Sequence, residues 1–186
     1  MGRYLRLPLT RPSILAGYIP HGEAGTAQTA GYIARLIREG ARDFFVRQAA
    51  IDVLFASRVR PKDYIGEITA LFEWVRRHLR YTRDPFRIEV LHSARRLLEL
   101  RAGDCDDHVI LLGAMLKSVG HPVRLVLTGP DARRPGLFSH IYLESWSRGR
   151  WIPLDATMSH PAGWAPRTPV RRRVPVEPAP VLAGCE

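Results

Sequence analysis

A chain of 186 residues with 46% hydrophobic and 25% charged residues is typical of one folded domain with a buried core, which excludes intrinsic disorder and collagen-like structure. No apolar run is long enough to span a membrane, and the N-terminus lacks the apolar core of a signal peptide, so we expect a soluble protein made in the cytoplasm. The formal net charge is +10. No nucleic-acid-binding motif accompanies this charge, so nucleic acid is not the expected partner.

The first half of the chain predicts helices. Prolines and glycines in residues 1–25 indicate an extended N-terminal segment, after which Thr26 is expected to cap a helix over residues 27–39. Further helices are expected from Asp43 to about Ser57, from Asp63 along an apolar face that ends at Leu79, and, as a short turn, from Ser93 to Leu100. The helix from Asp43 is expected to bury Phe44, Phe45, Ala49, Val53 and Leu54.

The second half of the chain predicts strands over residues 123–128, 138–146 and 151–156. Helices followed by antiparallel strands favour an α+β domain, which we expect over residues 26–158. From Ser159 the sequence is proline-rich and basic, without either periodicity. We therefore expect residues 159–186 to form a C-terminal arm that has no regular structure of its own and either floats free or is ordered by docking on another chain.

The stretch AGDCDDHVILLGAML, residues 102–116, places a thiol at the start of a buried helix. Asp104 is expected to cap this helix, and Asp107 to complete a capping box. Cys105 in the first turn would face free backbone N–H groups, which favour a thiolate and could receive an oxyanion. The neighbouring acids oppose this by raising the thiol pKa, so a cationic partner is expected opposite the sulfur. The alternative is that Cys105 is an ordinary small buried residue.

The segments HIYLESW and WIPLDAT supply a candidate base and acid for this thiol. A two-residue turn at residues 148–149 would pair Tyr142 with Asp155, whereas a turn at residues 147–148 would pair His140 with Asp155. In either register His140 and Asp155 lie on one face of the hairpin, at most one diagonal step apart. A carboxylate that orients an imidazole toward a thiol is the arrangement used in acyl transfer.

Metal chemistry is not expected. Cys105 and Cys185 fit neither a disulfide framework nor a zinc-ligand spacing, which indicates a reducing compartment and no cofactor. Asp104, Asp107 and His108 cannot converge on one ion, because consecutive helical residues diverge by about 100°. The histidines without a partner pattern are expected at the surface or in loops, namely His21, His78, His92, His121 and His160.

The strings GDCDDH, GHPVRLV, HIYLE and WIPLDAT resemble the core of the transglutaminase-like superfamily, which has a papain-like fold. The resemblance covers about residues 65–157 and implies a central helix, exposed at its N-terminus, that packs on an antiparallel sheet beside a helical N-terminal half. The longer pattern, with YTRDP and HSARRLL, is similar to small transglutaminase-like proteins encoded in tailed phages and prophages.

This resemblance implies that Cys105 is the nucleophile, His140 the general base and Asp155 the orienting acid. Ala156 departs from the family's D-P-T sequence, which leaves the turn after Asp155 less fixed. The second oxyanion donor in the family is usually a side chain ahead of the cysteine, and Tyr81 is the candidate. The remaining expectations are that Asp104 lines the substrate site and that Trp74 belongs to the core.

The expected function is a cysteine-dependent amide-bond hydrolase that acts on a protein or on a peptidoglycan peptide. One alternative is a protein-glutamine acyl transferase, which would use the same residues. The other is a phage tail or virion assembly protein that retains the fold for binding, with catalysis incidental or lost. In that case the C-terminal arm would contact other assembly proteins.

Overall fold

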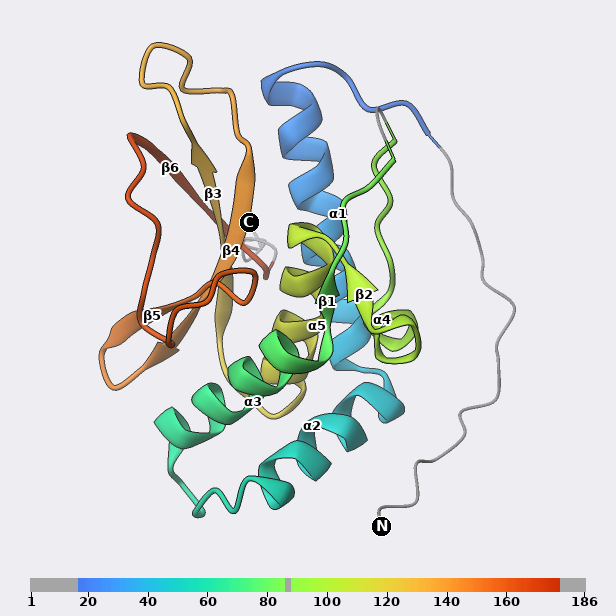
Figure 1. The fold of residues 1–186 in the computed structure, drawn as a ribbon, viewed down its shortest axis with the longest axis vertical. Coiled ribbons are helices and arrows are strands. Elements are labelled where there is room, and N and C mark those ends of the chain that lie inside the picture. Colours follow the sequence, from blue (N-terminus) through green and yellow to red (C-terminus); the bar gives the residue numbers. More distant parts are fainter. Residues whose placement is uncertain (1–16, 86–87, 178–186) are drawn as a thin grey trace, which may run out of the picture.

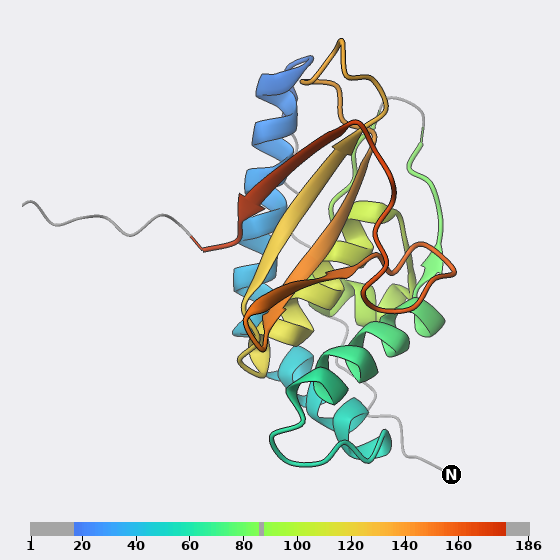
Figure 2. The same ribbon diagram turned by 90° about the vertical axis from the view of Figure 1, so that its left-hand side faces the viewer.

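The computed structural model describes residues 17–85 and 88–177. Five helices pack on a four-stranded antiparallel sheet, so the expected α+β class is confirmed (Figure 1). Figure 2 shows this sheet in front of the helices. No helix within the described residues is both long enough and apolar enough to cross a bilayer.

The elements follow one another in a simple order. The helices are α1 (Glu23–Ala41), α2 (Phe44–Ala56), α3 (Tyr64–His78), α4 (Ala94–Leu100) and α5 (Cys105–Ser118). The strands are β1 (Arg80–Tyr81), β2 (Ala102–Gly103), β3 (Val123–Gly129), β4 (His140–Ser147), β5 (Arg150–Leu154) and β6 (Val170–Pro175). The main sheet has the order β5-β4-β3-β6, and β1 pairs with β2 in a separate parallel ladder.

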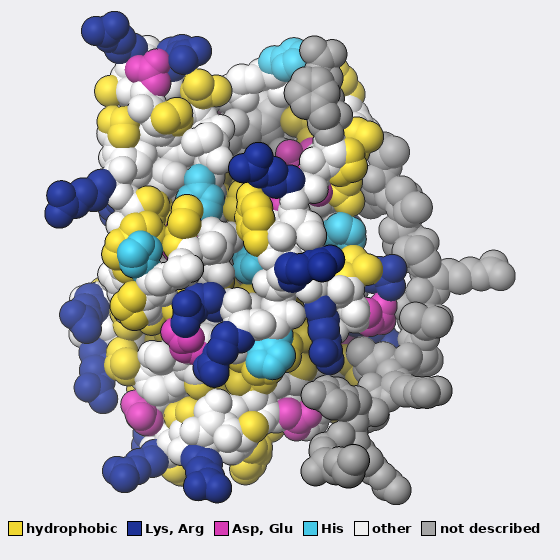
Figure 3. Space-filling view, in the orientation of Figure 1, with side chains coloured by type: hydrophobic (Ala, Val, Ile, Leu, Met, Phe, Trp, Pro, Cys, Tyr) yellow, Lys and Arg dark blue, Asp and Glu magenta, His cyan; other side chains and the backbone are white. Residues whose placement is uncertain are grey.

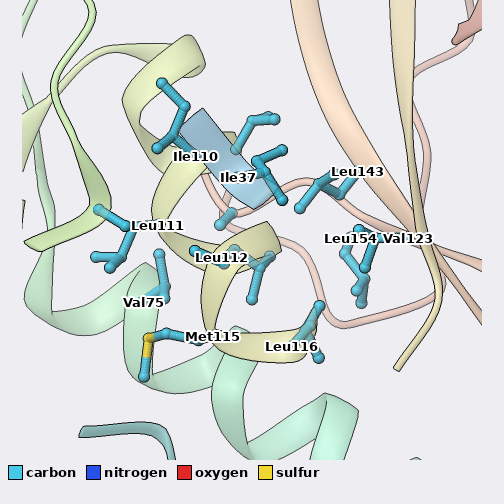
Figure 4. Close-up of a cluster of buried hydrophobic side chains, with 14 of the residues drawn as sticks. Ile37, Val75, Ile110, Leu111, Leu112, Met115, Leu116, Val123, Leu143 and Leu154 are labelled. Carbon is cyan, nitrogen blue, oxygen red and sulfur yellow. The ribbon is translucent and has the colours of Figure 1, made fainter. Parts of the chain in front are cut away.

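Helix α5 forms the centre of the molecule. It contacts the other four helices on one side and strands β3 and β4 on the other, and every residue from Asp106 to Leu116 is buried (Figure 4). Its closest helical neighbour is α1, where a Cβ atom on Gly113 would lie 2.9 Å from Ile37 Cδ1. The mostly apolar sequence of α5 thus fits a helix that is packed on all sides.

The helix starts mostly agree with their predicted caps. Asp43 accepts hydrogen bonds from two backbone N–H groups of α2, Asp63 accepts one in α3 and Ser93 one in α4. The prediction for α1 was wrong, because the helix starts at Glu23 after Gly22, whose φ of 74° suits glycine. Thr26 lies within the first turn instead of capping it.

Of the five residues predicted to be buried by α2, only Val53 is buried, whereas Phe45, Ala49 and Leu54 are partly buried and the prediction for Phe44 was wrong. Phe44 is 71% exposed, and the buried residues of this helix are Val46, Ala50 and Val53. These three buried residues are spaced by four and three positions, so they lie on one face of the helix, and that face packs on the core. Phe44 lies outside this face.

The segment after Ser159 also differs from the prediction. Residues 170–175 form β6, which pairs with β3 along six residues, and Val176 beyond it is buried. The proline at the end of β6 is tolerated because this strand lies at the edge of the sheet. Arg172 and Arg173 pair with Glu23 and Glu144 of the same chain, so these charges are engaged within the domain. The expectation of no regular structure is therefore wrong for β6, and residues 178–186 lie outside the described residues.

We predict that removal of residues 169–186 destabilises the domain, because β3 would lose β6, one of its two partner strands. The point variant Val176→Ala should lower the free energy of unfolding by about 2 kcal/mol, the scale of a truncated buried aliphatic side chain. Val170→Ala, at the partly buried opposite end of β6, is the control and should cost less. Urea unfolding measures all three. Equal stability of the wild type and Val176→Ala would contradict a structural role for this segment.

Candidate active site

The first turn of α5 carries the candidate nucleophile. Asp104 caps the helix as predicted, since its Oδ1 accepts hydrogen bonds from the backbone N–H groups of Asp106 and Asp107 at 3.0 and 3.3 Å. The predicted capping box does not form. The buried Asp107 carboxylate instead accepts the backbone N–H of His92 at 3.1 Å and lies 2.9 Å from its Nδ1. Asp107 thereby ties the segment before α4 to the mouth of α5.

The β4–β5 hairpin places the candidate base beside the candidate acid. Its turn lies at Arg148 and Gly149, with φ of 49° and 78°, as a two-residue turn with a left-handed pair requires. The observed pairs, from Ser147 with Arg150 to Leu143 with Leu154, match the first of the two predicted registers.

This register brings His140 and Asp155 into contact. The distance from His140 Nε2 to Asp155 Oδ2 is 2.8 Å, and Asp155 is only 3% exposed. The other oxygen of Asp155 accepts the backbone N–H and the hydroxyl of Thr157, which fixes the carboxylate. Nδ1 of His140 makes no hydrogen bond to any described residue, so this nitrogen is available to a thiol or a substrate.

Cys105, in the first turn of α5, lies next to the start of β4. A narrow pocket is lined by Cys105, Ile141 and Asp155, and the backbone N–H of Ile141 favours the charged form of the sulfur. Because Ile141 directly follows His140, the mouth of α5 and the His140–Asp155 pair meet in one region. Cys105 and Asp155 thus line one pocket, and His140 is held by its hydrogen bond to Asp155.

The electrostatics around Cys105 favour the thiol. Burial raises its pKa most, the charges of Asp106 and Asp104 add to this, and the thiol donates to Asp106 Oδ1 over 3.5 Å. The expected effect of the helix N-terminus is thus outweighed. In this state the sulfur carries its proton, and a base has to remove it before the sulfur can act as a nucleophile.

Four carboxyl groups surround this position: Asp84, Glu89, Asp104 and Asp106. Burial, opposed by the hydrogen bond from the Asp107 backbone and helped by neighbouring carboxylates, raises the pKa of Asp104 to about 6. Burial also raises the pKa of Asp106 well above its usual range, and a hydrogen bond with Glu89 adds to this. The oxygen atoms of Asp84, Glu89 and Asp104 lie within 4.8 Å of one another and could hold a cation. Shared protons explain the cluster equally well.

Asp107 and His108 each have partners other than a shared ligand. Asp107 binds His92, whereas both ring nitrogens of His108 face backbone carbonyl oxygens, Asp104 O at 2.7 Å and Leu79 O at 3.0 Å. His108 therefore links the end of α3 to the start of α5.

Tyr81 lies close to the sulfur. Strand β1 pairs Tyr81 with Gly103, two residues before Cys105, and the tyrosine ring is half-exposed. Burial raises the pKa of Tyr81, and the charges of Cys105 and Asp104 raise it further. Trp74 is partly buried against the core and stacks on His78 with ring centroids 4.6 Å apart.

Two histidines have partners that sequence analysis missed. His121 is buried, and its Nε2 lies 2.8 Å from Glu67 Oε2, while His92 contacts Asp107. Both histidines lie in loops, as expected, but the expectation that they have no partner was wrong. Each partner lies at least 15 residues away along the chain, so no local pattern indicates the contact.

The comparison with known proteins agrees with the fold. The family model described as the transglutaminase-like superfamily matches residues 55–156. None of the curated proteins matches the sequence.

Solved structures with TM-scores above 0.5 share the fold at low sequence identity. A candidate protease from Parabacteroides distasonis is 11% identical with a TM-score of 0.61, and the match covers 88% of this chain and 34% of that one. A structure of the Rad4/XPC nucleotide excision repair complex gives 13% identity and a TM-score of 0.52, over 76% and 41%. A candidate cysteine protease from Cytophaga hutchinsonii is 22% identical over 60% and 37%, with a TM-score of 0.46. This chain thus spans only about two fifths or less of each of these proteins.

We predict that Asp106→Asn speeds alkylation of Cys105 by iodoacetamide at neutral pH. The variant keeps an oxygen acceptor but removes a charge that raises the thiol pKa. More thiolate at lower intrinsic nucleophilicity gives a net gain of roughly threefold for each pKa unit. The measurement is the rate of modification against pH in a Cys185→Ser background. Asp131→Asn, an exposed carboxylate paired with Arg134, is the control. An unchanged rate profile in Asp106→Asn would contradict this account of the pKa.

Proposed function

This chain belongs to the transglutaminase-like superfamily, and we propose that it is a cysteine-dependent amide-bond hydrolase with Cys105, His140 and Asp155 as its catalytic residues. The observation that carries the proposal is the hydrogen bond between His140 Nε2 and Asp155. It directs the other ring nitrogen away from the acid, as a base that serves the sulfur requires.

The first half-reaction forms an acyl-enzyme. His140 Nδ1 takes the proton of the Cys105 thiol, and the sulfur attacks the amide carbonyl. The resulting oxyanion accepts hydrogen bonds from the backbone N–H of Cys105 and from Tyr81 Oη, which acts as the second donor. His140 then gives its proton to the leaving amine while the C–N bond breaks, which leaves a thioester on Cys105.

The second half-reaction restores the enzyme. His140 removes a proton from water, the hydroxide attacks the thioester, and the C–S bond breaks as His140 returns the proton to the sulfur, which releases a carboxylic acid. Attack by a substrate amine in place of water would give acyl transfer through the same residues. Open access to the cleft beside Tyr81 favours water, and hydrolysis is therefore the form of the reaction that we propose.

The raised pKa of Cys105 places a requirement on this mechanism. The thiol donates to Asp106 in the resting site, and this hydrogen bond must break before the sulfur can give its proton to His140. A substrate carbonyl that enters between Cys105 and Asp106 would separate them. The proposed enzyme is thus activated by its substrate instead of holding a permanent thiolate–imidazolium pair.

The proposed substrates are proteins or peptidoglycan peptides, and we propose a phage or prophage source for the chain. A binding role is the second candidate function, with a phage tail or virion assembly as the setting. The hydrogen bond from the thiol to Asp106 favours this candidate, since it holds the sulfur in its unreactive form.

We predict that Cys105→Ala abolishes amide hydrolysis and that His140→Ala lowers it by roughly 10²–10⁴-fold, the usual contribution of a general base. The assay compares release of amines from casein and from purified peptidoglycan. Melting curves control for folding. Activity in Cys105→Ala equal to that of the wild type would contradict the hydrolase, and a wild type inactive on every amide would favour the binding role.

We further predict that Asp155→Asn loses activity while it keeps the fold. Thr157 donates two hydrogen bonds to one oxygen of Asp155, so the amide of asparagine would turn its NH₂ group toward His140 Nε2. The ring would then carry its proton on Nδ1 and could not accept the thiol proton. A fall in kcat with a small change in melting temperature is the expected result. A large drop in melting temperature with kcat retained would indicate a purely structural aspartate.

A further inference from the structure

A basic cleft lies next to the candidate active site. It has a volume of about 360 Å³ and shares His108, Ala156 and Thr157 with the narrow pocket that contains Cys105. Its other walls are the end of α3, strand β1 and the segment after β5. A group bound in this cleft would therefore lie beside the sulfur.

The walls of the cleft carry an excess of positive charge. Arg76, Arg77 and Arg80 line it together with His78, and none of its described lining residues is acidic. Figure 3 shows basic side chains and histidines gathered over α3 and β1. The arginine side chains that line the cleft thus outnumber the carboxylates beside them.

Among the residues that the structure describes, Glu73 is the only carboxylate paired with these arginines. Glu73 lies 2.6 Å from Arg76 and 3.8 Å from Arg77, and Arg77 also donates to the Glu73 backbone carbonyl. Arg80 is exposed and forms no ion pair with any described residue. Two of the three guanidinium charges thus remain without a compensating carboxylate.

A structural role explains part of this pattern but not Arg80. Basic residues in the last turn of a helix stabilise its dipole, which accounts for Arg76 and Arg77 at the end of α3. Arg80 lies beyond the helix, on β1, and adjoins Tyr81. Its position fits the cleft, where an unpaired guanidinium can bind a planar carboxylate through two N–H groups.

The carboxyl groups beside Cys105 restrict where a substrate anion can lie. Asp84, Glu89, Asp104 and Asp106 surround the start of α5 and take no part in lining the cleft. A substrate carboxylate would be repelled there and attracted by Arg80. The arginine cleft is therefore the favourable position for an anionic group close to the sulfur.

We propose that this cleft binds a carboxylate of the peptide substrate next to the amide that Cys105 attacks, with Arg80 as its main partner. The proposal rests on the proposed function and names its substrate class, which is peptides with a free carboxylate near the reactive amide. The carboxylate can come from an acidic side chain or from a chain terminus, because both present the same two oxygens to a guanidinium.

The first experiment measures labelling of Cys105 in a Cys185→Ser background by two matched reagents. These are N-maleoyl-β-alanine, which carries a carboxylate, and its primary amide. We expect the carboxylate reagent to be favoured about three- to fivefold, the scale of one exposed ion pair. Arg80→Gln should remove the preference, Arg80→Lys should retain most of it, and added salt should weaken it.

The control is Arg60→Gln, which removes the same charge from an exposed arginine in the loop before α3. Equal rates of the two reagents with the wild type would overturn the proposal. An equal loss of preference in Arg60→Gln would also overturn it, because net charge and not the cleft would then explain the effect.

The second experiment separates this proposal from the proposed function. It measures binding of acetyl-Ala-Glu-Ala-amide, acetyl-Ala-Gln-Ala-amide and acetyl-Ala-Gln-Ala with a free carboxylate to the Cys105→Ala protein by NMR titration. We expect the two peptides with a carboxylate to bind more tightly and Arg80→Gln to remove the difference. Preference for one of them identifies the source of the carboxylate. Equal binding of all three overturns the cleft, even if the enzyme hydrolyses amides.

Discussion

Burial of α5 on every side is the constraint on which the other parts of this structure depend. The residues from Val109 to Leu116 carry no polar side chain and can be packed only between the other helices and the sheet. The free N–H groups at the start of the helix cannot be buried without partners, so the first turn must open toward a polar region. Cys105 occupies that turn, and the position of the candidate site therefore follows from the packing of the core.

Sequence analysis succeeded where the signal is local. Asp63 and Asp104 each cap a helix whose first N–H groups lie two or three residues away, and the pairing of His140 with Asp155 follows from strand periodicity and one short turn. It failed where the partner is distant in the chain. The sequence position of Asp107 is typical of a capping box, but in the fold Asp107 contacts His92. The arginines of β6 have the sequence pattern of an unstructured tail, but in the fold this segment pairs with β3, and Arg173 pairs with Glu144.

The same burial that makes α5 a rigid support also opposes ionisation of its thiol. Desolvation and nearby carboxylates raise the pKa of Cys105, whereas the backbone N–H of Ile141 lowers it. The site thus combines a well-positioned sulfur with a protonated resting state. The arginines of the neighbouring cleft, around Arg80, lie on the other side of the site, so the charges on the two sides of Cys105 have opposite signs. A ligand with a charge at one end would have only one favourable orientation in such a field.

The β4–β5 hairpin has a further consequence for how this chain can vary. Side chains on a strand alternate between faces, so one residue inserted at Arg148 or Gly149 would shift the pairing and turn His140 and Asp155 to opposite faces. The connection between β3 and β4, residues 130–139, is not a tight turn, so its length can change without a shift in the pairing of these two strands. Related chains should therefore differ in length before His140 and keep a constant spacing of fifteen residues from His140 to Asp155.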